Sequence, residues 1–419
     1  MDQYQSNRRL FGFCVLQGLI PSVVLATTPK QSALRYLTIP CMIWIMCQMM
    51  YPVSTPGFIP SNFLGHAVTF IFTAADYLLI NPQDRPDFVD SNGKTKSFLS
   101  RLAQSAQMIA CTRAVNTARQ AKNVPPMPAY YTKRDPKVIP RGRFLIRETA
   151  IAVWQFLALD IISTMASSKG LDQKENVPVS PGLKWDLRQL VAERIFPSLI
   201  IWFVVTRIGL SFYYRVTSII FVGLGDSPWN CPPSCGRMGD AYTLRGFWGK
   251  FWHQMLRLPL TSLSNFLARD VLRLPRPSVL ERYTNVFIVF FFSGLMHAIF
   301  DILRNVSIQE SGAISFFLSF VVGYMIEDGI QALWKRTQGS QNTNGTPPWW
   351  QKAIGLIWVG AWLGVTSTWL FGTMTQKPKH KIVLVPFTLL GSGLIDFRTL
   401  GSIVLVSGVV LKLIFEGEI

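Results

Sequence analysis

The chain has 419 residues, of which 49% are hydrophobic and 13% aromatic, and its formal net charge is +18. Only 15% of the residues are charged, whereas a typical soluble domain has about 25%. This composition excludes intrinsically disordered chains, collagen-like chains and disulfide scaffolds. The apolar residues come in long uncharged blocks, which indicates a polytopic membrane protein.

Nine apolar blocks have the length of a transmembrane helix, which needs about 20 mostly apolar residues. They are residues 10–28, 34–51, 62–80, 144–166, 191–212, 283–303, 312–334, 352–372 and 398–415. We predict eight or nine spans, because residues 382–395 are ambiguous and Arg207 and Arg215 interrupt the block from 191 to 225. No cleavage site ends the first block, so we expect a retained span rather than a signal peptide. The sequence predicts an all-α integral membrane protein in which residues 1–419 form a single unit.

The loop after the third predicted span carries half of the excess positive charge. Residues 81–147 contain thirteen Lys or Arg and four Asp, a net charge of +9. The positive-inside rule places this basic loop, with residues 81–143 as its body, in the cytosol. Attraction to the anionic lipids of the bilayer is the simplest further role. Nucleic acid binding is not expected, because no basic-aromatic module of known pattern accompanies the charge.

The segment between the fifth and sixth predicted spans mixes aromatic and charged side chains. Residues 226–282 contain eight basic and four acidic residues together with Trp229, Trp248 and Trp252. Residues 242–254 fit neither a helical nor a strand period. Such a mixture suits an amphipathic or re-entrant segment at the headgroup level. We therefore predict that residues 226–303 form a catalytic segment and a following helix that bears a histidine.

The chain has four histidines, namely His66, His253, His297 and His380. His297 lies in an uncharged run from 283 to 300, and an ionisable residue inside a membrane indicates function by default. Imidazole titrates near neutral pH, so His297 could be a general base for a hydroxyl group. The alternative is a neutral histidine that a neighbouring helix satisfies, and Asp301 could orient the ring in either case. His253 is either a site residue or an interfacial polar residue, while the other two are expected to be structural or solvated.

No metal site is expected from the sequence. Cys231 and Cys235 have the spacing of half a metal site, but no second Cys or His pair accompanies them. Glu327 and Asp328 could form a metal or proton site. The nearby Lys335–Arg336 pair favours an interfacial ion network instead.

Two motifs resemble a known family. Residues 247–254 read Phe-Trp-Gly-Lys-Phe-Trp-His-Gln, which resembles the Phe-Trp-Gly-x-x-Trp-His-Gln signature of the wax-synthase-like branch of membrane-bound O-acyltransferases. Residues 293–297 read Ser-Gly-Leu-Met-His, which resembles the Ser-Gly-x-x-His motif of that family. Plant wax synthases commonly have an acidic residue after this histidine, whereas Ala298 follows here. The chain is therefore most similar to fungal acetyltransferases of terpenoid and polyketide-terpenoid biosynthesis.

This resemblance implies acyl transfer from acetyl-CoA or another acyl-CoA to a hydroxyl group of a hydrophobic alcohol, in an endoplasmic-reticulum-type membrane. His297 would be the general base, and His253 would help to stabilise the anionic tetrahedral centre. Basic side chains would contact the CoA phosphates. The residues expected to bind the donor are Arg245, Trp248, Lys250, Trp252, Gln254 and Arg257.

Three other functions stay open at this point. A long-chain wax or sterol ester synthase would use the same chemistry. A transporter of a hydrophobic metabolite or ion would line a path with intramembrane charges, namely Asp76, Asp160, Arg207, His297 and Glu327. A structural membrane scaffold would need none of these groups.

Overall fold

The computed structural model describes residues 3–50, 58–83, 96–132, 138–168, 191–302, 306–338, 347–376 and 384–415. These residues form helices, turns and loops, with no strand among them. The chain packs into two compact units, Met1–Lys122 with Met255–Val321 and Asn123–Gln254 with Val322–Ile419. That the whole chain acts as one acyltransferase unit stays a prediction.

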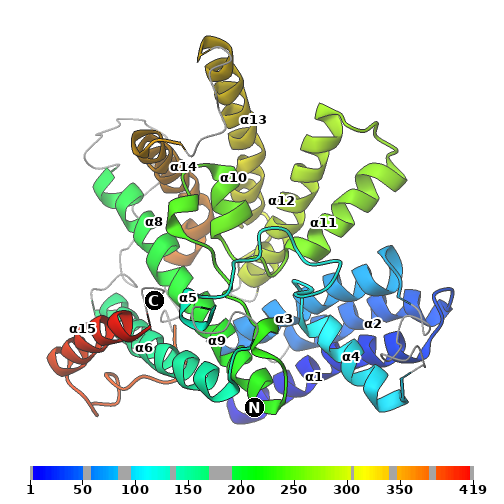
Figure 1. Cartoon of the computed structure of the whole chain (residues 1–419), viewed down its shortest axis with the longest axis horizontal. Helices are drawn as coiled ribbons and strands as arrows, with labels where there is room; N and C mark the ends of the chain where they lie inside the picture. The colour runs from blue at the N-terminus through cyan, green and yellow to red at the C-terminus, as the bar shows by residue number, and fades with distance from the viewer. Residues whose placement is uncertain are drawn as a thin grey trace. The chain divides into compact units, whose positions relative to one another are not determined.

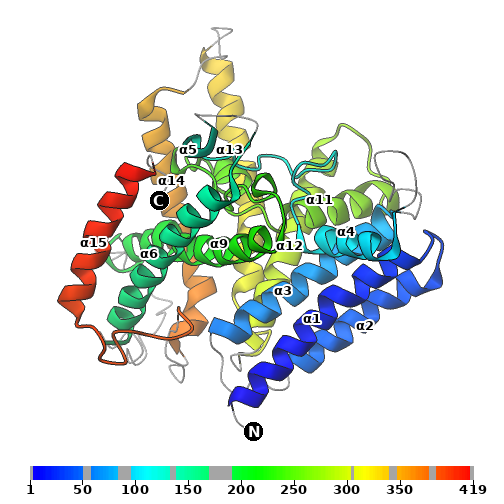
Figure 2. The same ribbon diagram turned by 60° about the horizontal axis from the view of Figure 1, so that its bottom comes forward.

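The first unit is built from the N-terminal helices and from the helix that bears His297. Its helices are α1 (Gln3–Thr27), α2 (Ala33–Met50), α3 (Phe58–Ala75), α4 (Phe98–Ala110), α11 (Arg257–Asn265), α12 (Val279–Ile302) and the beginning of α13 (Ala313–Gln338). A π-helical turn, Asp76–Ile80, continues α3, and another, Phe266–Val271, continues α11. Helices α1, α2 and α3 lie side by side (Figures 1 and 2).

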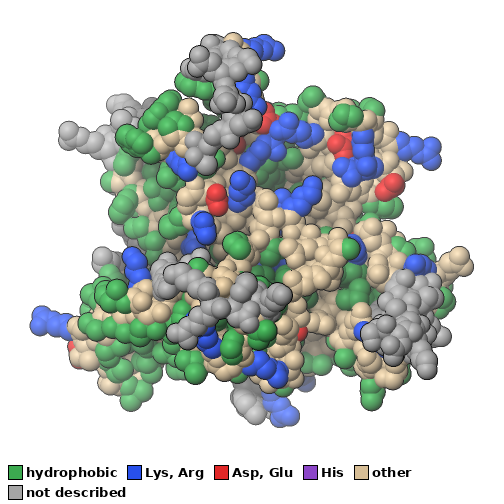
Figure 3. Space-filling model, viewed as in Figure 1, with side chains coloured by type: hydrophobic (Ala, Val, Ile, Leu, Met, Phe, Trp, Pro, Cys, Tyr) green, Lys and Arg blue, Asp and Glu red, His purple; other side chains and the backbone are tan. Residues whose placement is uncertain are grey.

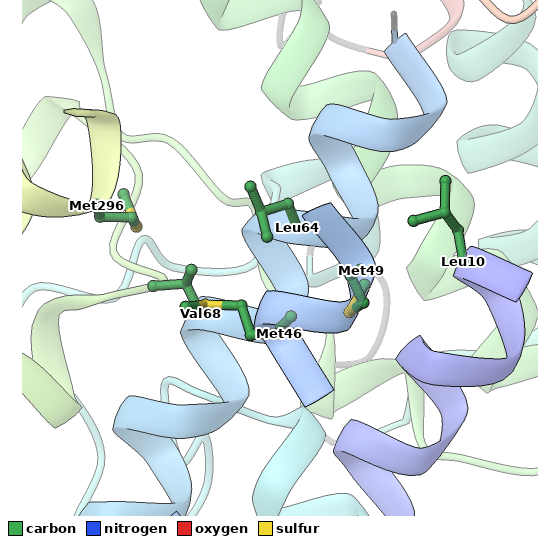
Figure 4. Packing of buried hydrophobic residues seen from close by; sticks show 7 residues of the cluster. Leu10, Met46, Met49, Leu64, Val68 and Met296 are labelled. Carbon is green, nitrogen blue, oxygen red and sulfur yellow. The ribbon is translucent and has the colours of Figure 1, made fainter. Parts of the chain in front are cut away.

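An apolar cluster joins α12 to the N-terminal helices. Figure 4 shows side chains of α1, α2 and α3 turned toward one another, with Met296 of α12 beside α3. A Cβ atom on Gly65 would lie 3.6 Å from the ring of Phe300, and the rings of Phe72 and Phe292 are 5.8 Å apart. These pairs run in opposite directions along the two helices, so α3 and α12 are antiparallel. This packing holds α12 at Met296, the residue directly before His297.

The second unit contains the aromatic-basic segment and the C-terminal helices. Its helices are α5 (Ala129–Thr132), α6 (Arg141–Ser168), α8 (Phe196–Ile200), α9 (Arg207–Leu224), α10 (Leu244–Gly246), the remainder of α13, α14 (Trp349–Gln376) and α15 (Phe397–Ile414). Two π-helical turns, Val191–Ile195 and Ile201–Thr206, make the chain continuously helical from 191 to 224. Arg207 and Arg215 do not break this helix, because the first donates to the Gly236 carbonyl and the second pairs with Glu148.

Seven of the described helices are long and apolar enough to cross a membrane, and the helix Leu64–Ile80 is a shorter apolar one. They account for eight of the nine predicted spans, and α6 covers the ninth, 144–166. Figure 3 shows a broad apolar surface over α6 and α15, where Leu405 and Leu413 of α15 are 74% and 77% exposed. Soluble proteins rarely expose a broad, contiguous apolar surface of this kind, whereas membrane proteins cover it with lipid. The protein is therefore an integral, multi-pass membrane protein.

The ambiguous stretch before the last helix is an ordered loop where the structure describes it. Residues 384–396 are not helical. Asp160 of α6 is fully buried, and its Oδ2 accepts hydrogen bonds from the backbone N–H groups of Leu389 and Leu390, at 2.8 and 3.2 Å. The loop then ends at Asp396, whose side chain caps the N-terminus of α15.

Some positive charge of the basic loop is engaged inside the protein rather than at the lipid surface. Arg119 donates to both carboxylate oxygens of Asp76, at 2.8 and 2.6 Å. Arg113 and Arg147 are buried. Helix α4 also forms within this loop. The cytosolic position of the loop stays a prediction, and residues 84–95 and 133–137 lie outside the described part.

Candidate active site

His297 has its ring orientation set by its own helix. Its Nδ1 atom lies 2.8 Å from the carbonyl oxygen of Ser293, one turn earlier in α12. A carbonyl oxygen can only accept a hydrogen bond, so Nδ1 carries the proton and Nε2 of the neutral ring keeps its lone pair. This is the tautomer that a general base needs, because Nε2 can then take up a proton.

The Ser-Gly-x-x-His motif has a structural reason at each of its first two positions. The Ser293 hydroxyl donates to the Val289 carbonyl at 2.9 Å, so this polar side chain is satisfied within its own helix. A Cβ atom on Gly294 would lie 2.8 Å from Cα of Ile314 and 3.3 Å from the Ala313 oxygen. Only glycine allows the start of α13 to approach α12 this closely.

The surroundings of His297 are apolar and aromatic. The ring centroid of Phe317 on α13 is 4.6 Å from the imidazole, and that of Phe300 is 5.8 Å away. Asp301 is buried, and its Oδ2 accepts the hydroxyl of Ser311 at 2.7 Å. The sequence suggested Asp301 as the group that orients the ring, whereas the Ser293 carbonyl holds Nδ1. A half-buried histidine among phenylalanines suits an apolar reactant.

The aromatic-basic segment is helical where the sequence showed no period. Helix α10 (Leu244–Gly246) continues directly into a π-helical turn, Phe247–Phe251, and the backbone becomes extended at Trp252. Leu244, Phe247 and Phe251 are fully buried. The helical segment is only eight residues long, and the π turn shifts its register. Periodicity therefore could not reveal this element.

The tryptophans of the segment pack in an aromatic cluster inside the second unit. Trp202 lies 4.9 Å from Trp252 and 6.0 Å from Trp248 between ring centroids, and Phe247 stacks on Trp252 at 5.5 Å. The Trp202 Nε1 atom donates to the Ser367 hydroxyl at 2.7 Å. Trp248 and Trp252, which were predicted to bind the donor, thus contribute to packing.

The other predicted binding residues differ in their environments. Arg245 pairs with Asp328 at 2.7 Å and lies 4.5 Å from the Tyr324 ring. Lys250 is exposed, which leaves its ammonium group accessible to a soluble anion. Gln254 is fully buried, and its Nε2 atom donates to the Trp252 carbonyl at 2.5 Å. Arg257 begins α11 in the first unit.

His253 follows the helical segment by two residues. It is half-buried, and its ring centroid is 5.5 Å from that of Trp252. His253 belongs to the second unit and His297 to the first. That both act on one reactant stays a proposal.

Sequence reasoning missed the role of several charged residues. Glu327 is buried and accepts hydrogen bonds from the backbone N–H groups of Leu244 and Arg245. Its position among apolar residues was visible in the sequence, but its partners were not. Asp328 pairs with Arg245, whereas Lys335 and Arg336 had been expected as its partners.

The charges of the predicted transport path have structural partners. Asp76 binds Arg119, Asp160 binds loop N–H groups, Arg207 binds the Gly236 carbonyl, and Glu327 binds Leu244. Within the described residues, no group of three or more His, Cys, Asp or Glu side chains could hold a metal ion. Cys231 and Cys235 are unbridged thiols.

Comparison with known proteins agrees with the motifs. The sequence pattern of the "Membrane bound O-acyl transferase family" matches residues 231–319, which include both motifs. The chain is 36% identical to acetyltransferase pyr8 of Aspergillus fumigatus over 414 residues, which cover 94% of each chain. It is 37% identical to acetyltransferase atnC of an Arthrinium species, over 89% of each chain. The chain belongs to the membrane-bound O-acyltransferase family.

A further relative is acetyltransferase TRI7 of Fusarium sporotrichioides, 33% identical over 96% of this chain and 94% of its own. No solved structure matches the chain significantly. The resemblance to fungal acetyltransferases is thereby confirmed, and the protein is an acyltransferase that uses an acyl donor in a membrane.

Proposed function

We propose that the protein transfers an acetyl group from acetyl-CoA to a hydroxyl group of a hydrophobic, terpenoid-type acceptor, with His297 as the general base. The observation that carries this proposal is the hydrogen bond from Nδ1 of His297 to the Ser293 carbonyl, since it orients the ring and makes Nε2 the nitrogen that can take up a proton. The names of the relatives support acetyl as the group transferred.

The reaction needs no covalent enzyme intermediate. The acceptor hydroxyl gives its proton to Nε2 of His297 while its oxygen attacks the thioester carbonyl. The tetrahedral anion then collapses, the carbon–sulfur bond breaks, and the CoA thiolate takes the proton from the imidazolium. The products are the ester and free CoA. Hydrogen-bond donors near the carbonyl oxygen would lower the barrier, and His253 and Gln254 are our candidates.

The acceptor and the donor are expected to use different features of the protein. The phenylalanines beside His297 suit an acceptor that dissolves in the bilayer. The exposed Lys250 suits a CoA phosphate, because ammonium groups bind phosphate by charge-assisted hydrogen bonds. Residence in the endoplasmic reticulum is part of the same proposal, and fluorescence co-localisation with a reticulum marker tests it.

The test is product analysis in membranes that contain the protein. Acetyl-CoA, octanoyl-CoA and palmitoyl-CoA, each with a labelled acyl group, are supplied with a set of terpenoid alcohols. We expect esters from acetyl-CoA that are absent with the His297→Ala variant at equal abundance in the membrane. Esters mainly from palmitoyl-CoA would favour a wax or sterol ester synthase instead. Flux of the alcohol across vesicles without ester formation would favour a transporter.

A further inference from the structure

The helical segment Leu244–Phe251 is bound at its N-terminus by a carboxylate from another helix. Glu327 of α13 is 5% exposed. Its Oε1 atom accepts hydrogen bonds from the Leu244 N–H and, at 3.0 Å, from Trp358 Nε1. Its Oε2 atom accepts from the Arg245 N–H at 3.3 Å. Three donors therefore converge on one carboxylate, which satisfies N–H groups that the first turn of a helix leaves unpaired.

The C-terminal end of the same segment is bound through a glycine. The Gly236 N–H donates to the Phe251 carbonyl at 2.9 Å, and the Gly236 carbonyl accepts from Arg207 Nη1 at 3.0 Å. The Arg207 guanidinium lies 5.0 Å from the Phe251 ring. A Cβ atom on Gly236 would lie 2.1 Å from the Lys250 oxygen, so only glycine allows this approach.

The two charges have the signs that a helix favours at its ends. A carboxylate stabilises the positive N-terminal end of the helix dipole, and a guanidinium stabilises the negative C-terminal end. Both residues lie in helices that are apolar enough to span a membrane, where an unpaired charge is costly. Their contacts with the segment explain why charges are present at these two positions.

Neighbouring glycines bring the segment and the spanning helices into close contact. A Cβ atom on Gly355 of α14 would lie 2.0 Å from the Tyr242 oxygen, and one on Gly323 of α13 would lie 2.5 Å from Leu244. The side chain of Leu244 and the backbone directly before the segment are therefore in close contact with α13 and α14, respectively. His253 and Gln254 follow the segment after Trp252.

We propose that Glu327 and Arg207 are positioning residues for acyl transfer, because they fix the helical segment that sets the place of His253 and Gln254. This inference rests on the proposed function. Neither residue contacts a reactant in this role. This role also differs from that of a residue in an ion-transport path, where the Glu327 carboxylate would bind and release protons or other ions.

The decisive variant is Glu327→Gln in the full-length enzyme. The amide of Gln has nearly the size of the carboxylate, but one of its two oxygen acceptors is replaced by an NH₂ donor. This NH₂ group would face an N–H donor of the segment and could not bind it. We expect kcat for ester formation to fall by about tenfold to 100-fold. KM for acetyl-CoA should rise by no more than the roughly threefold to tenfold expected from loss of the Lys250 contact, because Lys250 lies in the same segment. The shape of the pH profile of kcat should stay that of the wild type.

Asp328→Asn is the matched control. This carboxylate is the next residue of α13, and it pairs with the Arg245 side chain at a partly exposed position. We expect kcat within about twofold of the wild type, as for other partly exposed ion pairs. Trp358→Phe removes one of the three donors to Glu327 and serves as a milder test if Glu327→Gln does not fold. Arg207→Lys should retain more activity than Arg207→Met.

All kcat values refer to folded enzyme, measured as the monodisperse fraction in detergent. Wild-type kcat in both Glu327→Gln and Trp358→Phe would overturn the positioning role while the wild type still forms ester. Loss of one limb of the pH profile in Glu327→Gln would identify Glu327 as an acid or base and would also overturn it. A wild-type protein that forms no ester from any acyl-CoA would instead refute the proposed function, and the positioning role with it.

Discussion

The two motif regions of this protein hold their histidines in different ways. His297 lies in the last two turns of a long, regular helix, and the atom that orients its ring is a carbonyl one turn away in the same helix. His253 follows a short helical segment with a π turn, and the groups that hold this segment come from α9, α13 and α14. The first arrangement is local, and the second depends on tertiary packing.

This difference suggests a division of labour. A base must present one lone pair in a fixed direction, and an internal helical hydrogen bond does this at little cost. Stabilising the tetrahedral anion and binding a molecule as large as acetyl-CoA each require several protein groups at the same time. In our proposal the segment Leu244–Phe251 and the two residues after Trp252 supply these groups, because contacts at both ends of the segment fix its backbone.

The largest expected effect separates the roles of the two histidines. His297→Gln should lower kcat by about 10²–10⁴-fold, because an amide cannot take up the hydroxyl proton. His253→Gln should lower it much less than His253→Ala, because the amide still donates a hydrogen bond. Ester formation per folded enzyme measures both pairs. If the Gln and Ala variants lost equal activity at His297 and also at His253, the proposal that His297 is a base and His253 a hydrogen-bond donor would be contradicted.

A medium effect is expected at the close approach of α12 and α13. Gly294→Ala places a methyl group against Ile314, so the two helices must separate, which costs about 1–3 kcal/mol of stability. The midpoint of thermal unfolding in detergent should fall, and ester formation with it. Gly329→Ala is the control, because an added methyl group there meets no atom within 4 Å. An unchanged midpoint for Gly294→Ala would show that the helices tolerate separation.

The smallest effect is expected at the exposed Lys250. If its ammonium group contacts a CoA phosphate, Lys250→Gln should raise KM for acetyl-CoA by about threefold to tenfold at low salt. The kcat value should stay unchanged, and the difference from the wild type should shrink as salt is added. A KM equal to that of the wild type at low salt would assign the donor phosphates to other residues.

The sequence by itself determined where the long apolar helices lie and that His297 belongs to one of them. A helix in lipid must be apolar over its whole length, so each span is a local property of the chain. All nine apolar blocks coincide with helices in the described residues, although the helix that begins at 191 runs on to 224 instead of ending near 212. The Ser-Gly-x-x-His motif is also local, because its hydrogen bond joins residues four positions apart.

Only the tertiary structure decided how the segment Leu244–Phe251 folds and what holds it. It is only eight residues long and changes from an α-helical to a π-helical turn, so no regular period marks it as a helix. Glu327 is 83 residues from the N–H group of Leu244 that it binds, whereas sequence reasoning pointed to Lys335 and Arg336 as its partners. Contacts between distant residues depend on how whole helices pack, and hydropathy along the chain carries no information about that packing.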